Sequence, residues 1–156
     1  DMAEQTTFHR VIKDPNLDLK NKDIKKVVIS SGKVFYNLLE ERDRRKLKNV
    51  KLLRLEQIYP FPARTLKEEL GKTPNAEIVW CQEEPKNMGA WFFVDRKIED
   101  VLLSYKAKFS RPSYAGRLEA ASPATGSLSR HNREQAQLID LALETKDKNT
   151  SKQAAE

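Results

Sequence analysis

The chain has 156 residues, of which 38% are hydrophobic, and 29 basic residues against 23 acidic ones give a formal net charge of +6 at pH 7. This length fits one domain, because a single core usually serves about 100 to 200 residues. No apolar run reaches the ~20 residues needed to cross a bilayer and no secretory signal opens the chain, so we expect a soluble protein with no membrane partner. The single cysteine excludes an internal disulfide.

The composition divides the chain into three parts. Residues 1–23 are mostly polar, and we expect a lead-in segment that is anchored at its apolar residues, Phe8, Val11 and Ile12. Residues 24–146 contain the apolar blocks and are expected to fold as one α/β domain. Residues 147–156 are expected to form a charged, disordered tail.

Four strands alternate with four helices in the expected domain. Continuous, β-branched or short apolar runs predict the strands, at residues 26–31, 50–55, 76–82 and 112–116. Apolar residues at helical spacing predict the helices, at residues 33–46, 62–71, 87–105 and 127–145. Alternation of this kind favours parallel strands with right-handed crossovers. The predicted fold class is an α/β three-layer sandwich with a mostly parallel sheet of four to five strands.

The carboxyl ends of the predicted strands are polar, and ligands usually bind outside that edge of an open α/β sheet. The residues at these ends are Ser30 to Lys33, Glu56 and Gln57, Gln82 to Pro85, and Gly116 with Arg117. The first of these turns, SSGK, could hold an anion on backbone amides at a helix start. The glycines form neither GxGxxG nor GxxxxGK[ST], however, so a tight turn at Gly32 is the favoured interpretation.

The sequence predicts no catalytic or metal site. His9 and His131 are far apart, and one cysteine cannot form a thiolate site. Cys81 lies in an apolar strand, where we expect an unreactive buried thiol. Glu83 and Glu84 are adjacent, so in an extended chain they point to opposite faces and do not converge for acid/base hydrolysis. We expect each to accept hydrogen bonds from backbone amides or from an arginine across an interface.

A basic run, RDRRKLK at residues 42–48, ends the first predicted helix. Cations are favourable there because they meet the negative end of the helix dipole. No aromatic residue is interleaved for base stacking, so a solvated helix end is favoured over a nucleic-acid patch.

Four stretches, read together, resemble one family: SGKVFY (31–36), RLEQIYPFP (54–62), WCQEEPKNMGAW (80–91) and YAGR (114–117). They are similar to the carboxy-terminal domain of the thiamine-dependent, decarboxylating component of 2-oxoglutarate dehydrogenase. The resemblance runs from about Phe8 to Leu143. Two departures are Met88, where the family often has Gln, and the tail after Thr145, which matches nothing in the family pattern.

The resemblance implies a parent enzyme with the transketolase architecture, whose third domain is an α/β unit of this kind. The parent decarboxylates 2-oxoglutarate in the tricarboxylic acid cycle on thiamine diphosphate with magnesium, and passes the succinyl group to dihydrolipoyl succinyltransferase. The domain itself is expected to hold no cofactor and to be inactive alone. Its implied partners are the other domains of the same chain, a second copy in a homodimer and the succinyltransferase of the complex. The implied location is a bacterial cytoplasm or a mitochondrial matrix.

By resemblance, the domain supports dimer assembly and access to the active site, and in some relatives it helps to bind a regulatory acyl-CoA or nucleotide. The expected interface residues at the strand-end turn are Gln82, Glu83, Glu84, Asn87 and Trp91. The candidates for binding an anionic regulator are Lys33, Arg54 and Arg117, although an ion pair with the Glu83–Glu84 turn is the simpler interpretation of Arg117. The alternative functions are a stand-alone anion-binding or RNA-binding module and an acyl-CoA-sensing module.

Overall fold

A computed structural model of the chain describes residues 7–16 and 20–144, and its core is a five-stranded sheet. The strands are β1 (Val11–Ile12), β2 (Lys26–Ser30), β3 (Val50–Leu55), β4 (Glu77–Pro85) and β5 (Ser113–Arg117). The α-helices are α1 (Val34–Arg44), α2 (Ala63–Leu70), α3 (Trp91–Leu103) and α4 (Leu128–Leu143), and a short 3-10 turn covers Asn21–Asp23. The strand order is β1-β3-β2-β4-β5, with β1 antiparallel and the other pairings parallel.

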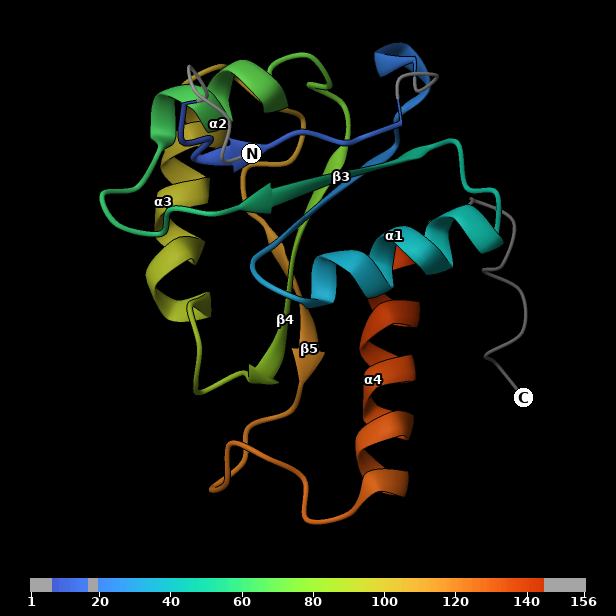
Figure 1. Ribbon diagram of the computed structural model, residues 1–156. Coiled ribbons are helices and arrows are strands. Elements are labelled where there is room, and N and C mark those ends of the chain that lie inside the picture. The colour runs from blue at the N-terminus through green and yellow to red at the C-terminus, as the bar shows by residue number, and fades with distance from the viewer. Residues whose placement is uncertain (1–6, 17–19, 145–156) are drawn as a thin grey trace, which may run out of the picture.

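Helices cover both faces of the sheet, so the predicted three-layer α/β sandwich is confirmed. Helices α2 and α3 lie on one side of the strands and α1 and α4 on the other (Figure 1). Alternate residues of each strand enter opposite cores: in β2, Val27 and Ile29 pack toward α2 and α3, whereas Val28 packs toward α1 and α4. This two-sided burial explains why the strands read as continuous apolar runs.

The lead-in segment joins the sheet through a strand that sequence reasoning missed. Val11 pairs with Leu55 and Ile12 with Arg54, which makes β1 an antiparallel edge strand. Val11 is buried, as expected of the anchored piece, but Phe8 is 69% exposed and does not anchor it. Residues 1–6 and the predicted tail at 147–156 lie outside the described residues.

Two buried ion clusters hold the lead-in segment against the domain. The carboxylate of Asp14 accepts hydrogen bonds from Arg42 of α1 and from the backbone N–H of Leu52. Lys13 pairs with the buried Glu69 of α2 at 3.1 Å. Burial opposes the charge on Glu69, but hydrogen bonds from lysine side chains outweigh it and lower the pKa of this carboxyl.

Strand β4 extends beyond the predicted run of residues 76–82, because Glu83 and Glu84 continue the strand to Pro85. The expected polar turn at Gln82–Pro85 is therefore wrong. A register irregularity lies between Cys81 and Pro85, after which Pro85 pairs with Arg117 of β5. A bulge of this kind leaves residues between the paired positions free to use their polar groups elsewhere. None of the described helices is long and apolar enough to span a membrane.

Candidate functional site

The buried side chain of Gln82 organises the carboxyl end of β4. Its Oε1 accepts a hydrogen bond from the indole Nε1–H of Trp80 at 2.9 Å and another from the backbone N–H of Trp91 at 3.0 Å. Trp91 is the first residue of α3, and its N–H has no partner within the helix. Gln82 thus joins the strand to the helix that follows it.

The amide group of Gln82 fixes the turn between these two elements. Its Nε2 donates to three backbone carbonyl oxygens, those of Met88 at 2.7 Å, Pro85 at 3.2 Å and Glu84 at 3.3 Å. Because a glutamine amide has only two N–H groups, some of these contacts are shared. All hydrogen-bonding groups of this side chain face the protein interior, so Gln82 positions the turn and does not face a ligand.

A second set of contacts ties the turn to β5 and to the loop beyond it. The Trp91 and Tyr114 rings lie 5.2 Å apart between centroids, and the Tyr114 hydroxyl donates to the carbonyl of Arg117 at 2.9 Å. Burial raises the pKa of Tyr114 to about 12, so it stays a neutral donor. The side chain of Asn87 pairs with the backbone of Ala120: its Nδ2 donates to the carbonyl at 3.0 Å and its Oδ1 accepts from the N–H at 3.1 Å.

The two adjacent glutamates of the stretch 80–91, Glu83 and Glu84, have separate environments. The carboxylate of Glu83 accepts a hydrogen bond from Gln135 of α4 at 3.0 Å. Glu84 is exposed, and within the described residues no hydrogen bond or ion pair reaches its carboxylate. Within the described residues, the partner of Glu83 is a glutamine side chain, and an arginine from across an interface stays a prediction for both glutamates. The structure does not bring the two carboxylates together.

The three basic candidates lie along one edge of the sheet but do not form a cluster. Arg54 and Arg117 end strands that are three positions apart in the sheet, roughly 14 Å. Arg54 pairs with Glu56 at 2.6 Å, and its guanidinium lies 5.1 Å from the Tyr36 ring centroid. Lys33 is exposed and follows β2, a strand that lies between β3 and β5 in the sheet.

Arg117 pairs with a different carboxylate from the one expected. Its Nε contacts Glu134 of α4 at 2.9 Å, and its Nη1 donates to the backbone carbonyls of Glu83 at 3.4 Å and Pro123 at 3.1 Å. The interpretation of an ion pair with Glu83 or Glu84 is wrong in its partner, because the ion pair is with Glu134 and Glu83 accepts from Arg117 through its backbone carbonyl. Sequence reasoning missed Glu134 and Gln135 as partners of Arg117 and Glu83, because nothing in the sequence pattern places this part of α4 against β4 and β5.

Cys81 is fully buried, as expected. Burial, with a smaller contribution from the charge of Glu83, raises its pKa to about 12. The thiol therefore stays protonated near neutral pH and is a poor nucleophile. Among residues 7–16 and 20–144, no group of three or more His, Cys, Asp or Glu could hold a metal ion. The described residues offer no ligand set for magnesium.

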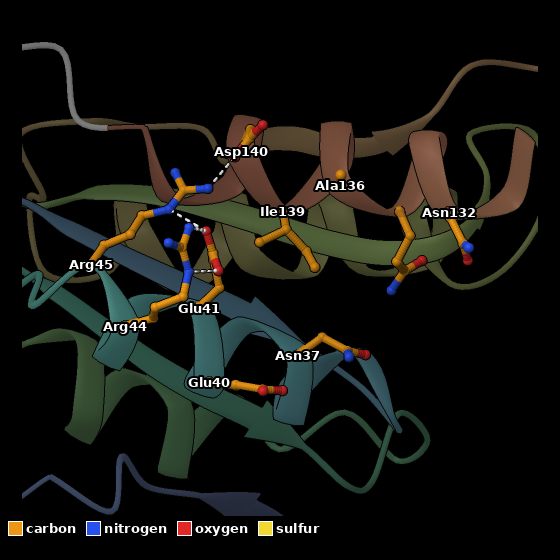
Figure 2. Close-up of a pocket in the computed structure, with 10 residues that line it drawn as sticks. Asn37, Glu40, Glu41, Arg44, Arg45, Asn132, Ala136, Ile139 and Asp140 are labelled. Carbon is orange, nitrogen blue, oxygen red and sulfur yellow. Dashed lines mark hydrogen bonds and ion pairs between the residues drawn. The ribbon is translucent and has the colours of Figure 1, made fainter. Parts of the chain in front are cut away.

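A polar cleft of about 370 Å³ lies between α1 and α4 (Figure 2). Arg44 and Arg45 both contact Glu41, at 2.6 and 2.5 Å, and Arg45 also pairs with Asp140 across the cleft. Hydrogen bonds from Arg44 and then Arg45 lower the pKa of Glu41 to about 2. These charges neutralise one another, so the cleft joins two helices and presents little uncompensated charge to a ligand.

The fold and this edge define an α/β domain in which residues of the stretch 80–91 build a fixed turn between β4 and α3. The chain belongs to the 2-oxoglutarate dehydrogenase C-terminal family, whose model matches residues 1–143. Proteins called "2-oxoglutarate dehydrogenase E1 component" from Brucella anthropi, Brucella ovis and Brucella melitensis are each 48% identical to it over 151 residues. The match covers 92% of this chain and 15% of each relative, so the chain spans a small part of the relatives' length.

Proposed function

We propose that this chain is a non-catalytic domain that supports the oxidative decarboxylation of 2-oxoglutarate by a longer protein. In this proposal its strand-end edge packs against other domains, supports the dimer and shapes the approach to an active site. Thiamine diphosphate and magnesium are held elsewhere in the longer protein, which works in the tricarboxylic acid cycle with dihydrolipoyl succinyltransferase.

The observation that carries the proposal is that Gln82 and Asn87, both in the stretch 80–91, use their polar groups in hydrogen bonds within the domain. Gln82 uses its carboxamide on the turn and on the start of α3, and Asn87 uses its own on the loop at Ala120. A catalytic group must instead reach a reacting atom with a free donor or acceptor. Residues whose hydrogen bonds hold a turn in one conformation are typical of a preformed surface that other domains can recognise.

The same edge exposes a large aromatic side chain that has no function in the core. Tyr36 lies near the start of α1, which follows the carboxyl end of β2, and is 58% exposed. Its hydroxyl accepts a hydrogen bond from Arg54 at 2.6 Å, which holds the ring in place. Tyrosine and arginine are enriched at the centres of protein interfaces, because they combine apolar area with directed hydrogen bonds.

Truncation of Tyr36 in the longer protein tests this function. Tyr36→Ala should raise the dimer dissociation constant by about tenfold or more and lower the rate of 2-oxoglutarate decarboxylation, as for an interface residue worth above 1 kcal/mol. Leu103→Ala is the matched control, because Leu103 is 59% exposed at the end of α3, which lies at the opposite edge of the sheet. Equal effects of both variants, or none from Tyr36→Ala, would contradict the proposal.

Regulation by an anionic acyl-CoA or nucleotide is a further part of the proposal. Lys33 is exposed and makes no ion pair with the described residues, so it could meet a phosphate directly. Arg54 and Arg117 would each exchange a carboxylate partner for the ligand. Titration of acetyl-CoA into the longer protein should give heat that Lys33→Ala reduces and the exposed-site control Lys48→Ala does not. Absence of heat from the unsubstituted protein leaves the structural role alone.

A further inference from the structure

A groove of about 620 Å³ lies between α3 and the segment formed by the loop after β3 with α2. We call it the aromatic groove and define it by six of its lining residues: Tyr59, Phe61, Phe93, Val101, Lys67 and Lys97. Tyr59 is 80% exposed and Phe93 40% exposed, and their rings meet edge to face with centroids 6.4 Å apart. A contiguous exposed apolar patch rimmed by polar residues commonly marks an interaction site.

The rim of the groove is positively charged. Lys97 is exposed and forms no ion pair with any described residue, and Lys67 donates only to the backbone carbonyl of Ser104, at 3.3 Å. Asp100 is the acidic residue that lines the groove. An apolar floor with uncompensated ammonium groups at its rim complements a segment that carries both apolar side chains and carboxylates.

We propose that the aromatic groove receives an acidic, amphipathic segment of the longer protein from outside these 156 residues. The inference rests on the proposed function, in which this chain is one domain of a longer polypeptide. Most of the relatives' length lies outside the part that this chain matches, so such a segment has a source. Its apolar side chains lie on Phe61, Phe93 and Val101, and its carboxylates face Lys67 and Lys97. Aromatic anchors with a polar rim are the usual composition of such contacts.

Site-specific photo-cross-linking in the longer protein tests the inference. Phe93 is replaced by p-benzoylphenylalanine, the protein is irradiated and digested, and the linked peptides are identified by mass spectrometry. We expect a linked peptide from outside residues 1–156 that combines Asp or Glu with large apolar residues. The same replacement at Phe92 is the matched control, since Phe92 is 62% exposed on the same helix and does not line the groove.

The charge requirement is tested in the same preparation. Lys97→Glu should lower the cross-link yield from position 93 by about threefold or more, as for loss of an exposed ion pair. Lys48→Glu, at an exposed lysine far from the groove in the fold, should leave the yield unchanged. The decarboxylation rate of the unsubstituted protein reports separately on the proposed function.

Four outcomes would overturn the inference. They are a peptide from residues 1–156 of a second copy, a peptide from a different protein, no cross-link from position 93, and a yield that Lys97→Glu does not change. If Tyr36→Ala still lowers the rate of 2-oxoglutarate decarboxylation in any of these cases, the groove assignment is wrong and the proposed function stands.

Discussion

The side chain of Gln82 lies directly against the backbone of Gly89. A Cβ placed on Gly89 would lie 2.9 Å from Gln82 Nε2, closer than carbon atoms tolerate. Gly89 also has φ +67°, a conformation that side chains disfavour. A side chain at position 89 would therefore meet both the Gln82 amide and a disfavoured φ, whereas glycine tolerates both.

Gly89→Ala should destabilise the domain by about 1–3 kcal/mol, because alanine would take a strained φ and displace the Gln82 amide. Urea denaturation followed by tryptophan fluorescence measures this free energy of unfolding. Gly126→Ala is the control, since nothing lies within 4 Å of its added Cβ. We expect the control to change stability by about 0.5 kcal/mol or less.

Gln82→Leu should lower the free energy of unfolding by about 2–4 kcal/mol, because leucine fills the space but leaves the buried Trp80 indole N–H without its acceptor. The carbonyl oxygens around the turn lose their donor as well. Gln137→Leu, at an exposed position on α4, should be nearly neutral. Similar denaturation midpoints for the two variants would show that the Gln82 network contributes little.

Glu41 should make stability depend on acid pH. Its pKa falls from 4.5 to about 2 in the folded state through hydrogen bonds from Arg44 and Arg45. The folded state thus gains stability from this group above pH 4.5 and loses it as the pH falls toward 2. In Glu41→Gln the melting temperature should vary less across that window than in the unsubstituted chain. Glu40→Gln, which removes the neighbouring carboxylate, should retain the full variation.

Cys81 should resist thiol reagents in the folded chain at pH 8, because burial raises its pKa to about 12 and keeps solvent away. Labelling with a chromogenic disulfide reagent measures this directly. The thiol should react completely once the chain is unfolded in urea. Rapid labelling of the native protein would place Cys81 at an accessible surface and contradict the buried arrangement.

The strands and helices of the domain were predictable because burial on both faces produces apolar runs that can be read locally. Strand β3 begins and ends at the predicted residues. Strand β1 could not be predicted, since two residues carry too little pattern and their pairing depends on β3. The extension of β4 was missed because Glu83, Glu84 and Pro85 have low strand propensity, which pairing with β5 overrides.

The partners of Arg117 could not be read from the sequence either. Glu134 is 17 residues further along the chain and reaches Arg117 because α4 packs on β5. Local patterns predict which residues end a strand, but the helix face that meets them is set by packing. Lys33, Arg54 and Arg117 lie at the carboxyl ends of their strands, but the ion pairs of Arg54 and Arg117 could not be predicted.

The antiparallel direction of β1 gives the domain a mechanical connection. The carbonyl of Arg10, just before β1, accepts hydrogen bonds from the backbone N–H groups of Glu56 at 3.0 Å and Gln57 at 3.2 Å. These residues begin the loop that carries Tyr59 and Phe61. The carbonyl of Arg10 therefore links the start of β1 to the first residues of that loop, so a displacement of the lead-in strand would be passed to the wall of the aromatic groove.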